Sequence, residues 1–391
     1  MTRPQLRKGR PQPRNRYLAL TAVGLEPALL AEAQALGLEE CRPASGAVFF
    51  NGGLEACYRA NLWLRSASRV LRLLAEFDCP DDAALYREVY RLDWAGWMEV
   101  GQTLAVRVRQ KAAQAMPRSL SHSQFVAQRV KDGIVDRFRD DCGRRPSVNL
   151  EHPDVQVHVY LADGRCTLSL DSSGAPLFMR GYRQGPAPAP LKETLAAGLI
   201  GLTGWQAQVP FYDFLCGTGT LAIEAALIAG RRAPGLLRED FGFLRWLDHQ
   251  PSTWQAQRRQ AQEAAVPVPV PILASDADGA AVAGARANAR RAGVEEAITF
   301  AVREAAQFEA TAGPGLILIN PPYGERLGEV KHLAGFYKQL GDVLKQRAKG
   351  MEAFIFTAQS GLFKSIGLRP ARRHILWNGP LECRLLHYRL Y

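Results

Sequence analysis

The second half of the chain alternates between strand-like and helix-like segments, and this rhythm constrains the fold more than any other feature. From residue 209 onward, short apolar runs that end in polar or glycine-rich residues are followed by longer segments with helical periodicity. Strands that alternate with helices form βαβ units, so we predict a mainly parallel sheet covered by helices. Such sheets bind ligands at the carboxyl ends of their strands, and four of the expected ends carry unusual residues.

The first of these strand ends is the sequence DFLCGTGT, residues 213–220. Gly217 and Gly219 allow a tight turn and a close approach of the backbone to a ligand. Together with Ala222 they match the loose G-x-G-x-x-G/A dinucleotide pattern, which alone is a weak signal. No Lys-Ser/Thr pair follows the glycines, which argues against a P-loop. Cys216 has no evident histidine partner, so a packed thiol is a better interpretation than a nucleophile.

Two later strand ends carry acidic residues. Asp276 ends the strand ILASD, where a carboxylate can accept hydrogen bonds from both hydroxyls of a ribose. It can also cap the helix expected to begin at Gly279. A dinucleotide fold places this acid about 20 residues after the glycines, whereas about 60 intervene here, which disfavours a nicotinamide cofactor. Glu304, at the end of AITFAVRE, can accept from an exocyclic amino group such as that of adenine, or can simply be exposed.

The fourth strand end is LILINPPY, in which Asn320, Pro321, Pro322 and Tyr323 follow four apolar residues. Two consecutive prolines lack N–H groups and stiffen the chain, so the strand stops and its last carbonyl groups lack ladder partners. The Asn320 side chain adds another acceptor nearby, and the pair suits a planar amino group with two N–H donors. Tyr323 can stack on the ring that bears this amino group, a contact worth roughly 1–3 kcal/mol per base.

Length and charge indicate a multidomain protein with a polyanionic partner. The chain has 391 residues, of which 47% are hydrophobic, and a net charge of +11. Residues 1–16 hold six basic residues and no acid, which predicts a disordered basic arm. The seven cysteines include no CxxC pair or zinc-like cluster, and no signal peptide or membrane-length apolar run occurs. We therefore expect a cytoplasmic protein without a bound metal.

The first half of the chain predicts a small α+β region of alternating strands and helices. Apolar residues at helical spacing indicate a helix over 121–141, and two strand-like runs meet at Asp163-Gly164, a typical hairpin turn. The stretch FMRGYRQGPAPAPLKETLAAGLI, residues 178–200, indicates a linker followed by a helix. Arg180 and Arg183 in this stretch can bind phosphate, or can be ordinary solvated residues.

The motifs DFLCGTGT, ASD, VRE and NPPYGER, in this order, resemble the S-adenosylmethionine (SAM) motifs of class I Rossmann-like methyltransferases. The longer strings MRGYR, APLKETLAAGLI, GTGTLAIEAALIA and NPPYGERLG resemble the THUMP-domain RNA methyltransferases of the bacterial RlmL/YpsC type. The resemblance covers nearly everything after the basic arm and implies an α/β fold. The implied domains are a ferredoxin-like segment (17–45), a THUMP RNA-binding domain (46–172), a linker (173–190) and a C-terminal class I methyltransferase domain (191–391).

The resemblance also implies a function: methyl transfer from SAM to the exocyclic N2 amino group of a guanosine in 23S ribosomal RNA. In this reading Asn320 and the Pro321 carbonyl orient the amine within the catalytic motif that Pro322 and Tyr323 complete, and Tyr323 stacks on guanine. The cofactor-binding residues are Asp213, Cys216, Gly217, Thr218, Gly219, Thr220, Asp276, Glu304, Lys192, Glu193 and Thr194. The RNA-binding residues are Arg180 and Arg183. We also expect a monomer or weak dimer.

The chain departs from the family pattern at three positions, and several alternatives stay open. Phe214 stands where proline is usual, Thr218 where serine is usual, and Glu304 where aspartate is more frequent. A tRNA guanosine is the nearest alternative substrate. NPPY suits any planar amine or amide, so a DNA adenine-N6 or protein glutamine methyltransferase is also possible. A non-catalytic RNA-binding assembly factor and an NAD-dependent oxidoreductase are rivals that would not bind SAM.

Overall fold

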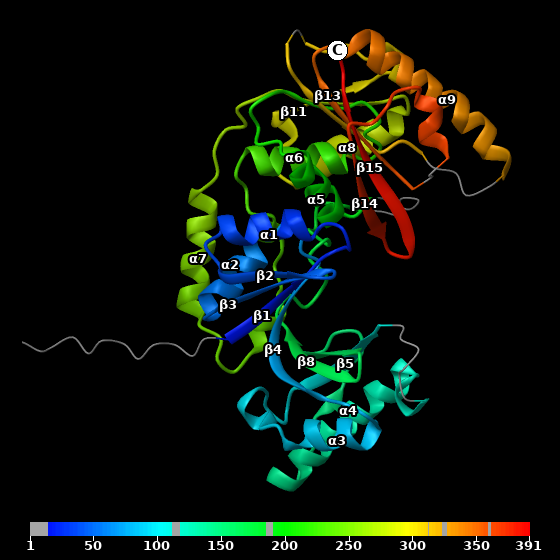
Figure 1. Cartoon of the computed structure of the whole chain (residues 1–391). Helices are drawn as coiled ribbons and strands as arrows, with labels where there is room; N and C mark the ends of the chain where they lie inside the picture. Colours follow the sequence, from blue (N-terminus) through cyan, green and yellow to red (C-terminus); the bar gives the residue numbers. More distant parts are fainter. Residues whose placement is uncertain (1–14, 112–117, 185–190, 312, 323–326, 359–360) are drawn as a thin grey trace, which may run out of the picture.

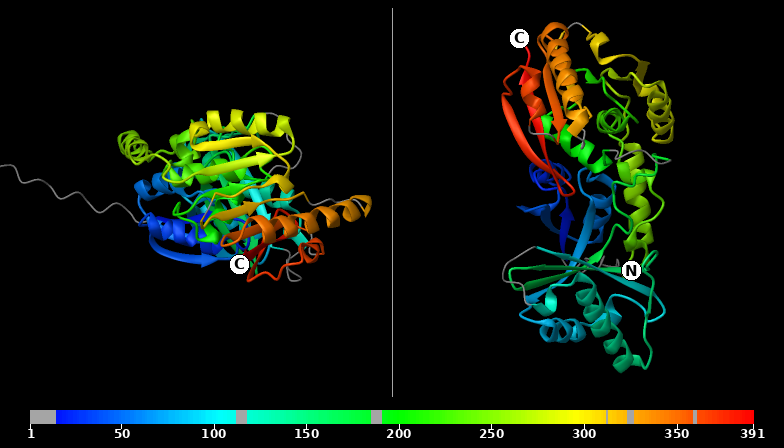
Figure 2. Two further views of the ribbon diagram at one scale, coloured as in Figure 1. Left: turned by 90° about the horizontal axis from the view of Figure 1, so that it is seen from above. Right: turned by 90° about the vertical axis from the view of Figure 1, so that its right-hand side faces the viewer.

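The computed structural model describes residues 15–111, 118–184, 191–311, 313–322, 327–358 and 361–391. These residues form an eight-stranded sheet in the first half of the chain and a seven-stranded sheet in the second half. The molecule is elongated, with the seven-stranded sheet at one end and the elements between residues 82 and 142 at the other (Figures 1 and 2). The expected basic arm lies outside the described residues except for Asn15 and Arg16, which begin the first strand.

The eight-stranded sheet has the order β2-β3-β1-β4-β8-β7-β5-β6. Its strands are β1 (Asn15–Leu20), β2 (Glu39–Ala44), β3 (Ala47–Gly52), β4 (Arg69–Asp78), β5 (Thr103–Gln110), β6 (Ser147–Val148), β7 (Val155–Ala162) and β8 (Arg165–Asp171). The long strand β4 pairs with β1 on one side and with β8 on the other. The sheet is therefore continuous from the ferredoxin-like segment into the segment expected to be the THUMP domain.

Four helices pack against this sheet, α1 (Glu26–Ala35) and α2 (Leu54–Trp63) beside β1, β2 and β3, and α3 (Asp82–Arg91) and α4 (Ser123–Cys142) at the other half, beside β5 and β8 (Figure 1). Side chains of a strand point alternately to the two faces of a sheet. In β7, Val157 and Val159 join the buried cluster beneath the helices, whereas Tyr160 is 40% exposed on the other face.

Most elements expected in the first half are present, and three strands or α-helices were not predicted. The helix expected over 121–141 is α4, and the expected hairpin is the antiparallel pair β7–β8. Its turn residues Asp163 and Gly164 have φ values of 51° and 75°, the left-handed region that this turn requires. The unpredicted elements are β2, α3 and the two-residue strand β6. β2 is largely exposed and contains charged residues and a proline, so it lacks the alternating apolar pattern of a half-buried strand.

The seven-stranded sheet has the order β11-β10-β9-β12-β13-β15-β14. Its strands are β9 (Phe211–Asp213), β10 (Ile272–Asp276), β11 (Ile298–Val302), β12 (Leu316–Ile319), β13 (Glu352–Thr357), β14 (Arg372–Asn378) and β15 (Leu381–Arg389). The first five are parallel, and the β14–β15 hairpin adds two antiparallel strands. This arrangement confirms the predicted α/β fold with a mainly parallel sheet.

Helices cover both faces of this sheet, and its central strands are buried. They are α5 (Glu193–Thr203), α6 (Thr220–Ala229), α8 (Gly279–Arg291) and α9 (Leu327–Arg347), whereas α7 (Pro251–Glu263) packs on the first half of the chain. All four residues of β12 are buried, as expected for a parallel strand covered on both sides. The strand order reverses between β9 and β12, which creates the switch point at which such sheets bind ligands. None of the described helices is long and apolar enough to cross a membrane.

The long segment between α6 and β10 packs back onto the first half of the chain. Helix α7 lies beside α2, and the two views of Figure 2 agree with Figure 1 on this placement. The ring of Phe243 lies 4.6 Å from that of Tyr58 and 4.9 Å from that of Trp254, measured between centroids. These aromatic contacts join the two halves and account for the wide sequence separation between the glycine loop and Asp276.

Candidate functional site

The parallel strands bring the predicted site residues to one edge of the sheet. Asp213 ends β9 and is paired in register with Ala274 of β10, two residues before Asp276. On the other side β9 pairs with β12, whose end continues into Asn320. Glu304 lies just beyond the end of β11 and is exposed. The four strand ends singled out in the sequence are therefore neighbours, as expected for a parallel sheet.

The loop between β9 and α6 is fixed to the end of β10 by two hydrogen bonds. The backbone N–H of Cys216 donates to the Ser275 carbonyl at 2.9 Å, and that of Gly217 donates to Oδ2 of Asp276 at 2.8 Å. Gly217 has φ 49°, and a Cβ built there would meet no atom within 4 Å. Open space above a left-handed glycine is a cradle into which a ligand can approach the backbone closely.

Gly219 serves packing rather than access. It has φ 82° and immediately precedes α6, and a Cβ there would lie 2.9 Å from the Cβ of Ala285. The loop is also held from α8, because Nδ2 of Asn288 donates to the Thr218 carbonyl at 3.0 Å. No sequence signal had marked Asn288, since an asparagine within a helix is unremarkable until its partner is known.

The carboxylate of Asp276 is oriented by the backbone. Oδ2 accepts from Gly217 and Oδ1 accepts from the N–H of Asp278 at 3.1 Å. Each carboxylate oxygen retains a further lone pair, so both can accept hydroxyl groups of a ribose. The helix cap considered for Asp276 is supplied by Asp278 instead, whose side chain accepts from the N–H of Ala280 at 2.8 Å.

Asp213 is a buried acid, and only one of its two carboxylate oxygens accepts a hydrogen bond from the described residues. Its side chain is 1% exposed, Oδ1 accepts from the N–H of Leu215 at 3.4 Å, and Oδ2 has no hydrogen-bond partner among the described residues. Burial, with a smaller contribution from the charge of Asp276, raises the pKa of Asp213 to about 8. The carboxyl group is therefore largely protonated at neutral pH until a donor or a positive charge arrives.

Asn320 holds a second buried acceptor without a partner. Its Oδ1 is buried and receives no hydrogen bond from the part of the chain that the structure describes. Pro321 is buried and Pro322 is exposed. The Pro322 carbonyl accepts from the hydroxyl of Tyr337 at 3.5 Å, so this tyrosine of α9 helps to fix the loop. Tyr323, the expected stacking residue, lies outside the described residues.

Arg183 joins the linker to the first turns of α5 and α6. Its Nη2 donates to the Leu191 carbonyl at 2.9 Å and to Oγ1 of Thr220 at 2.8 Å, and its Nε lies 3.2 Å from Oε1 of Glu193. These contacts place Thr220 and Glu193 beside the glycine loop. They also occupy the Arg183 guanidinium, which is directed inward rather than toward an RNA phosphate.

Arg180 is buried, which argues against the expectation that it contacts RNA. The residue is 2% exposed, and its guanidinium donates to the carbonyls of Leu177 and Arg65 at 2.7 and 2.6 Å. It forms an ion pair with Glu224 of α6 at 3.5 Å. Tyr182 also donates to Glu224, at 3.1 Å. Arg180 is therefore neither a solvated linker residue nor an exposed phosphate ligand in this structure. It belongs to a buried polar network that joins the two halves of the chain.

The remaining predicted residues fall into two groups. Cys216 is 6% exposed, and burial raises the pKa of its thiol, so the interpretation as a packed thiol rather than a nucleophile fits the structure. Glu193 and Thr194 begin α5 and are buried. Lys192 precedes them, with its Nζ 5.2 Å from the centroid of the Phe178 ring. Burial raises the pKa of Glu193, although Arg183 opposes this shift.

Comparison with protein families matches three parts of the chain. Residues 16–71 match the RlmL ferredoxin-like domain, and residues 80–171 match the THUMP domain. The first match extends beyond the expected segment 17–45, consistent with the shared sheet strand β4. Residues 180–387, more than half of the chain, match the RMKL-like methyltransferase domain.

Named relatives agree with these matches. The chain is 41% identical over 384 residues to "Ribosomal RNA large subunit methyltransferase K/L" of Syntrophotalea carbinolica, covering 95% of this chain and 53% of that protein. The chain thus spans about half the length of that relative. It is 40% identical to the Synechocystis protein slr0064, described as a candidate RNA methyltransferase, and covers 97% of it.

Two solved structures resemble the whole chain. One is a predicted N6-adenine-specific DNA methylase from Listeria monocytogenes, with TM-score 0.86, 30% identity and 97% of each chain covered. The other is SMU.472, a candidate methyltransferase complexed with SAH, with TM-score 0.85 and 30% identity. This second alignment covers 97% of the present chain and 98% of SMU.472. The resemblance therefore includes the arrangement of both halves.

Proposed function

The chain belongs to the family of RMKL-like methyltransferase domains, and from this membership we propose that it is a SAM-dependent RNA methyltransferase. The proposed reaction transfers a methyl group to the exocyclic N2 amino group of a guanosine in 23S ribosomal RNA. One observation carries the proposal. Two buried acceptors that have no partner among the described residues, Oδ2 of Asp213 and Oδ1 of Asn320, lie at the ends of the neighbouring strands β9 and β12.

Unpaired buried acceptors need an explanation, because each one costs about 1–3 kcal/mol. Here they flank the point at which the strand order reverses, where open α/β sheets bind their ligands. A ligand that brings N–H donors to both positions removes this cost. A cofactor with an amino group and a substrate with an aromatic amine would do so.

The chain's own residues fit the cofactor. Asp213 and the open backbone at Gly217 would line its methionine part, and Asp276 would accept the ribose hydroxyls. Glu304 would accept from the adenine amino group, and the buried start of α5 with Lys192 would close the site. When bound, SAM supplies a methyl group on a sulfonium, which is already activated for transfer. The residues therefore need to bind and orient the reactants, and no covalent catalyst is required.

The Asn320 side chain and the Pro321 carbonyl would hold the target amine. The lone pair of the guanine amino group is delocalised into its ring, so the amine is a weak nucleophile. Two accepted hydrogen bonds would favour positive charge developing on this nitrogen during transfer. Holding the amine in line with the methyl group would supply much of the rest, since positioning can contribute roughly 7–11 kcal/mol. The proton can leave to water after the transfer.

The substrate class is supported by the first half of the chain and by the names of the relatives. The ferredoxin-like and THUMP matches accompany the methyltransferase domain, and the relatives' names refer to the large ribosomal RNA. The Listeria structure carries a DNA-methylase name, so DNA adenine remains the alternative acceptor. A tRNA guanosine is the alternative within RNA.

The test is methyl transfer from labelled SAM to protein-free 23S rRNA and, separately, to bulk tRNA, both from cells that lack this gene. The products are digested and the modified nucleoside is identified. N2-methylguanosine from 23S rRNA is the expected result, and the Asn320→Ala variant should yield none. N2-methylguanosine from tRNA alone would keep the proposed reaction and show that the substrate is tRNA and not 23S rRNA. Methylated adenine in DNA, or no SAM binding at all, would overturn the proposal.

A further inference from the structure

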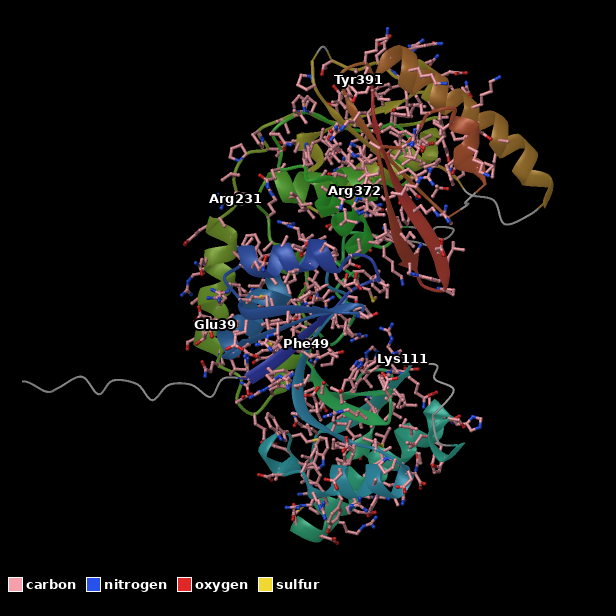
Figure 3. All side chains as sticks on the ribbon, viewed as in Figure 1. Glu39, Phe49, Lys111, Arg231, Arg372 and Tyr391 are labelled. Atoms are coloured by element: carbon pink, nitrogen blue, oxygen red, sulfur yellow. The ribbon has the colours of Figure 1, made fainter. Side chains whose placement is uncertain are left out.

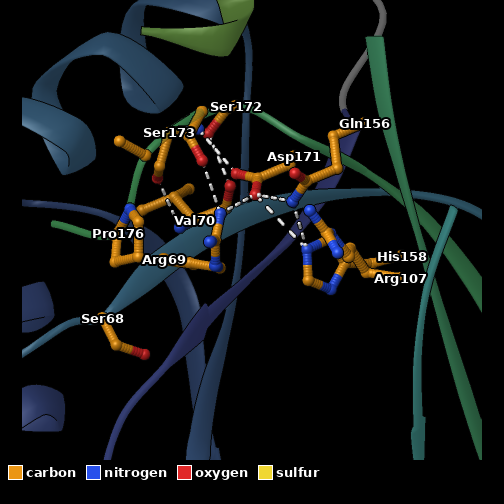
Figure 4. A network of polar contacts seen from close by, with 12 residues as sticks. Ser68, Arg69, Val70, Arg107, Gln156, His158, Asp171, Ser172, Ser173 and Pro176 are labelled. Atoms are coloured by element: carbon orange, nitrogen blue, oxygen red, sulfur yellow. Dashed lines mark hydrogen bonds and ion pairs between the residues drawn. The ribbon is translucent and has the colours of Figure 1, made fainter. Parts of the chain in front are cut away.

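The linker between the two halves begins in a network of hydrogen bonds at the end of β8. Oδ1 of Asp171 accepts from the backbone N–H of Ser173 at 2.8 Å, and Arg69 of β4 forms an ion pair with the same carboxylate (Figure 4). Oγ of Ser173 accepts from the backbone N–H of Val70 at 2.9 Å. The start of residues 173–184, which we call the strut, is therefore fixed to two strands of the first half.

One buried arginine holds the middle of the strut. Arg238 lies in the segment between α6 and β10 and is 7% exposed. Its guanidinium donates to four carbonyl groups of the strut at 2.8–3.1 Å, those of Ser173, Ala175, Pro176 and Met179. Hydrogen bonds from a charged donor are roughly twice as strong as those between neutral groups. The strut is therefore fixed to the methyltransferase half as well.

The two halves also pack directly on each other. Helix α1 of the first half contacts α5 of the second, and a Cβ built at Gly198 would lie 2.6 Å from the side chain of Leu25. Figure 3 shows the side chains that fill this junction. Within the strut, Arg180 donates to the Arg65 carbonyl of the first half and pairs with Glu224 of the second. A displacement of the strut would break these contacts, so the packing of the two halves sets its position.

The end of the strut reaches the glycine loop through helix α8. The Tyr182 carbonyl accepts from Nε of Arg291 at 2.6 Å, and Nη2 of Arg291 donates to Oδ1 of Asn288. Nδ2 of Asn288 donates to the Thr218 carbonyl at 3.0 Å, and Asn288 is 4% exposed. Because a guanidinium can only donate, Arg291 fixes which end of the Asn288 amide faces the loop. Two residues of α8 thus transmit the position of the strut to the loop.

A second contact joins the strut to the loop directly. Nη2 of Arg183 donates to Oγ1 of Thr220, the first residue of α6, at 2.8 Å. The strut therefore holds the loop at Thr220 through Arg183 and at the Thr218 carbonyl through α8. Gly217, which precedes both points, is held by Asp276.

The flexibility of the glycine loop explains why this support matters. Gly217 and Gly219 have φ values of 49° and 82°, and glycine loses more conformational freedom on ordering than any other residue. A loop that its ligand must order binds more weakly than one that is ordered beforehand. The contacts from the strut, from α8 and from Asp276 order the loop in the absence of a ligand.

We propose that the strut positions the glycine loop for SAM, and that Asn288 and Arg291 are the positioning residues that connect the two. Both act through the Thr218 carbonyl, because Arg291 orients Asn288 and Asn288 holds the loop. The affinity for SAM then depends on the contact between the two halves, and SAM binding in turn restrains the strut, since coupling between two sites is reciprocal. The proposal rests on the SAM site of the proposed function and adds how the first half of the chain supports that site.

The test measures the Kd of the full chain for S-adenosylhomocysteine (SAH) by isothermal titration calorimetry. Asn288→Leu removes both hydrogen bonds of the amide and should weaken binding about three- to tenfold, the range of one lost hydrogen bond. Arg291→Met should weaken binding by a smaller factor, and Arg291→Lys, which retains a donor group, should recover part of the loss. The double variant should bind no more weakly than Asn288→Leu, because Arg291 acts through Asn288.

Arg286→Met is the matched control. Arg286 belongs to the same helix and donates to the Phe300 carbonyl of β11 at 2.8 Å, rather than to the strut or the loop. Urea unfolding should show a similar small loss of stability in Arg286→Met and Arg291→Met, whereas only Arg291→Met should change the Kd for SAH. Arg238→Lys tests the strut at a distance. An ammonium group has three donors for four carbonyl groups, so this variant should also bind SAH more weakly.

Hydrogen–deuterium exchange supplies a readout other than affinity. SAH should slow amide exchange in peptides of the parent that cover residues 178–184, and Arg291→Met should lose this protection. A merely structural role predicts that the variant exchanges faster by the same factor with and without SAH. Folded Asn288→Leu and Arg291→Met variants with the parental Kd would overturn the proposal, and so would an equal loss of affinity in Arg286→Met.

These outcomes are separate from those that test the proposed reaction. SAH binding needs neither RNA nor methyl transfer, so strut-dependent binding without formation of N2-methylguanosine would reject the reaction and keep the strut. Methylation by the parent together with one SAH affinity in all variants would reject the strut and keep the reaction. A parent that does not bind SAH would overturn both.

Discussion

The backbone N–H of Gly217 donates a hydrogen bond to Oδ2 of Asp276 at 2.8 Å, across 59 positions of sequence. This contact joins the glycine loop after β9 to the acidic end of β10. The two elements expected to hold opposite ends of a nucleoside cofactor are thus fixed relative to each other by the fold. A site assembled in this way does not have to be ordered by its ligand, which favours affinity.

Replacing Asp276 should damage the cofactor site in two ways. Asp276→Ala removes the acceptor proposed for the ribose hydroxyls and also removes the acceptor of the Gly217 N–H. We expect SAM affinity to fall at least about tenfold, corresponding to one or two charge-assisted hydrogen bonds. Isothermal titration calorimetry measures this effect. Asp278→Ala is the matched control, because it removes the α8 cap and not the site; equal losses in both variants would contradict the role of Asp276.

Replacing Asn320 should separate catalysis from cofactor binding. Asn320→Ala deletes the buried Oδ1, which has no partner in the described part of the chain, so we expect turnover on RNA to disappear while the Kd for SAM changes less than about twofold. The free energy of unfolding should not fall, because no described hydrogen bond of that oxygen is lost. Single-turnover methylation, calorimetry and urea unfolding test these three statements. A large loss of SAM affinity would show that Asn320 serves the cofactor instead.

The buried Asp213 predicts a pH dependence of stability. Its pKa rises from 3.8 to about 8 on folding, so the folded state keeps a proton that the unfolded state releases. Between about pH 4 and pH 8 the folded state binds more protons, and the free energy of unfolding therefore falls as the pH rises through this window. Asp213→Asn should remove this contribution and be more stable than the parent at pH 8, by about 1–3 kcal/mol.

Urea unfolding of both proteins at pH 5 and pH 8 provides the measurement for Asp213. The difference between variant and parent should be larger at pH 8. A difference that is larger at pH 5 would reverse the sign and reject a protonated Asp213. We expect SAM binding by the variant to be weaker, since the acid is lost from the cofactor site.

Replacing Tyr337 should loosen the catalytic loop. Its hydroxyl donates to the Pro322 carbonyl and lies 2.9 Å from Oγ1 of Thr357. Tyr337→Phe should reduce kcat several-fold, with little change in SAM affinity, because the loop that we propose holds the amine loses an anchor. The loss of stability should be about 1 kcal/mol. A variant with parental kcat would show that the prolines alone fix the loop.

The burial of Arg180 gives a prediction opposite to that expected of an RNA-binding arginine. Arg180→Met leaves Glu224 buried without its cationic partner, so we expect a loss of about 3–5 kcal/mol in the free energy of unfolding. RNA affinity of the folded variant should be unchanged at fixed salt. The exposed Arg91 supplies the control, since Arg91→Met should alter stability little. Weaker RNA binding by a fully stable Arg180→Met would restore the original expectation.

The sequence was informative wherever a local pattern has one physical solution. Apolar runs separated by helical periodicity can bury their surface only as a helix-covered parallel sheet, and that sheet is present. Consecutive prolines must end the strand at Asn320, and glycines must occupy the turn at Gly217, whose φ is positive. The convergence of Asp213, Asp276 and Asn320 followed from these patterns, because parallel strands end at a common edge.

Only the tertiary structure shows that Arg180 is buried and that the first half of the chain forms one continuous sheet. Arg180 faces inward because Glu224, 44 positions later in the sequence, lies buried across the domain interface, and sequence spacing carries no trace of that partner. The segment around Trp254 resembles a surface insertion until it packs on Tyr58 of the other half. The single sheet of the first half likewise depends on β4, which pairs with β1 on one side and with β8 on the other. Local sequence fixes the preferences of a segment, whereas burial and pairing depend on residues far away in the chain.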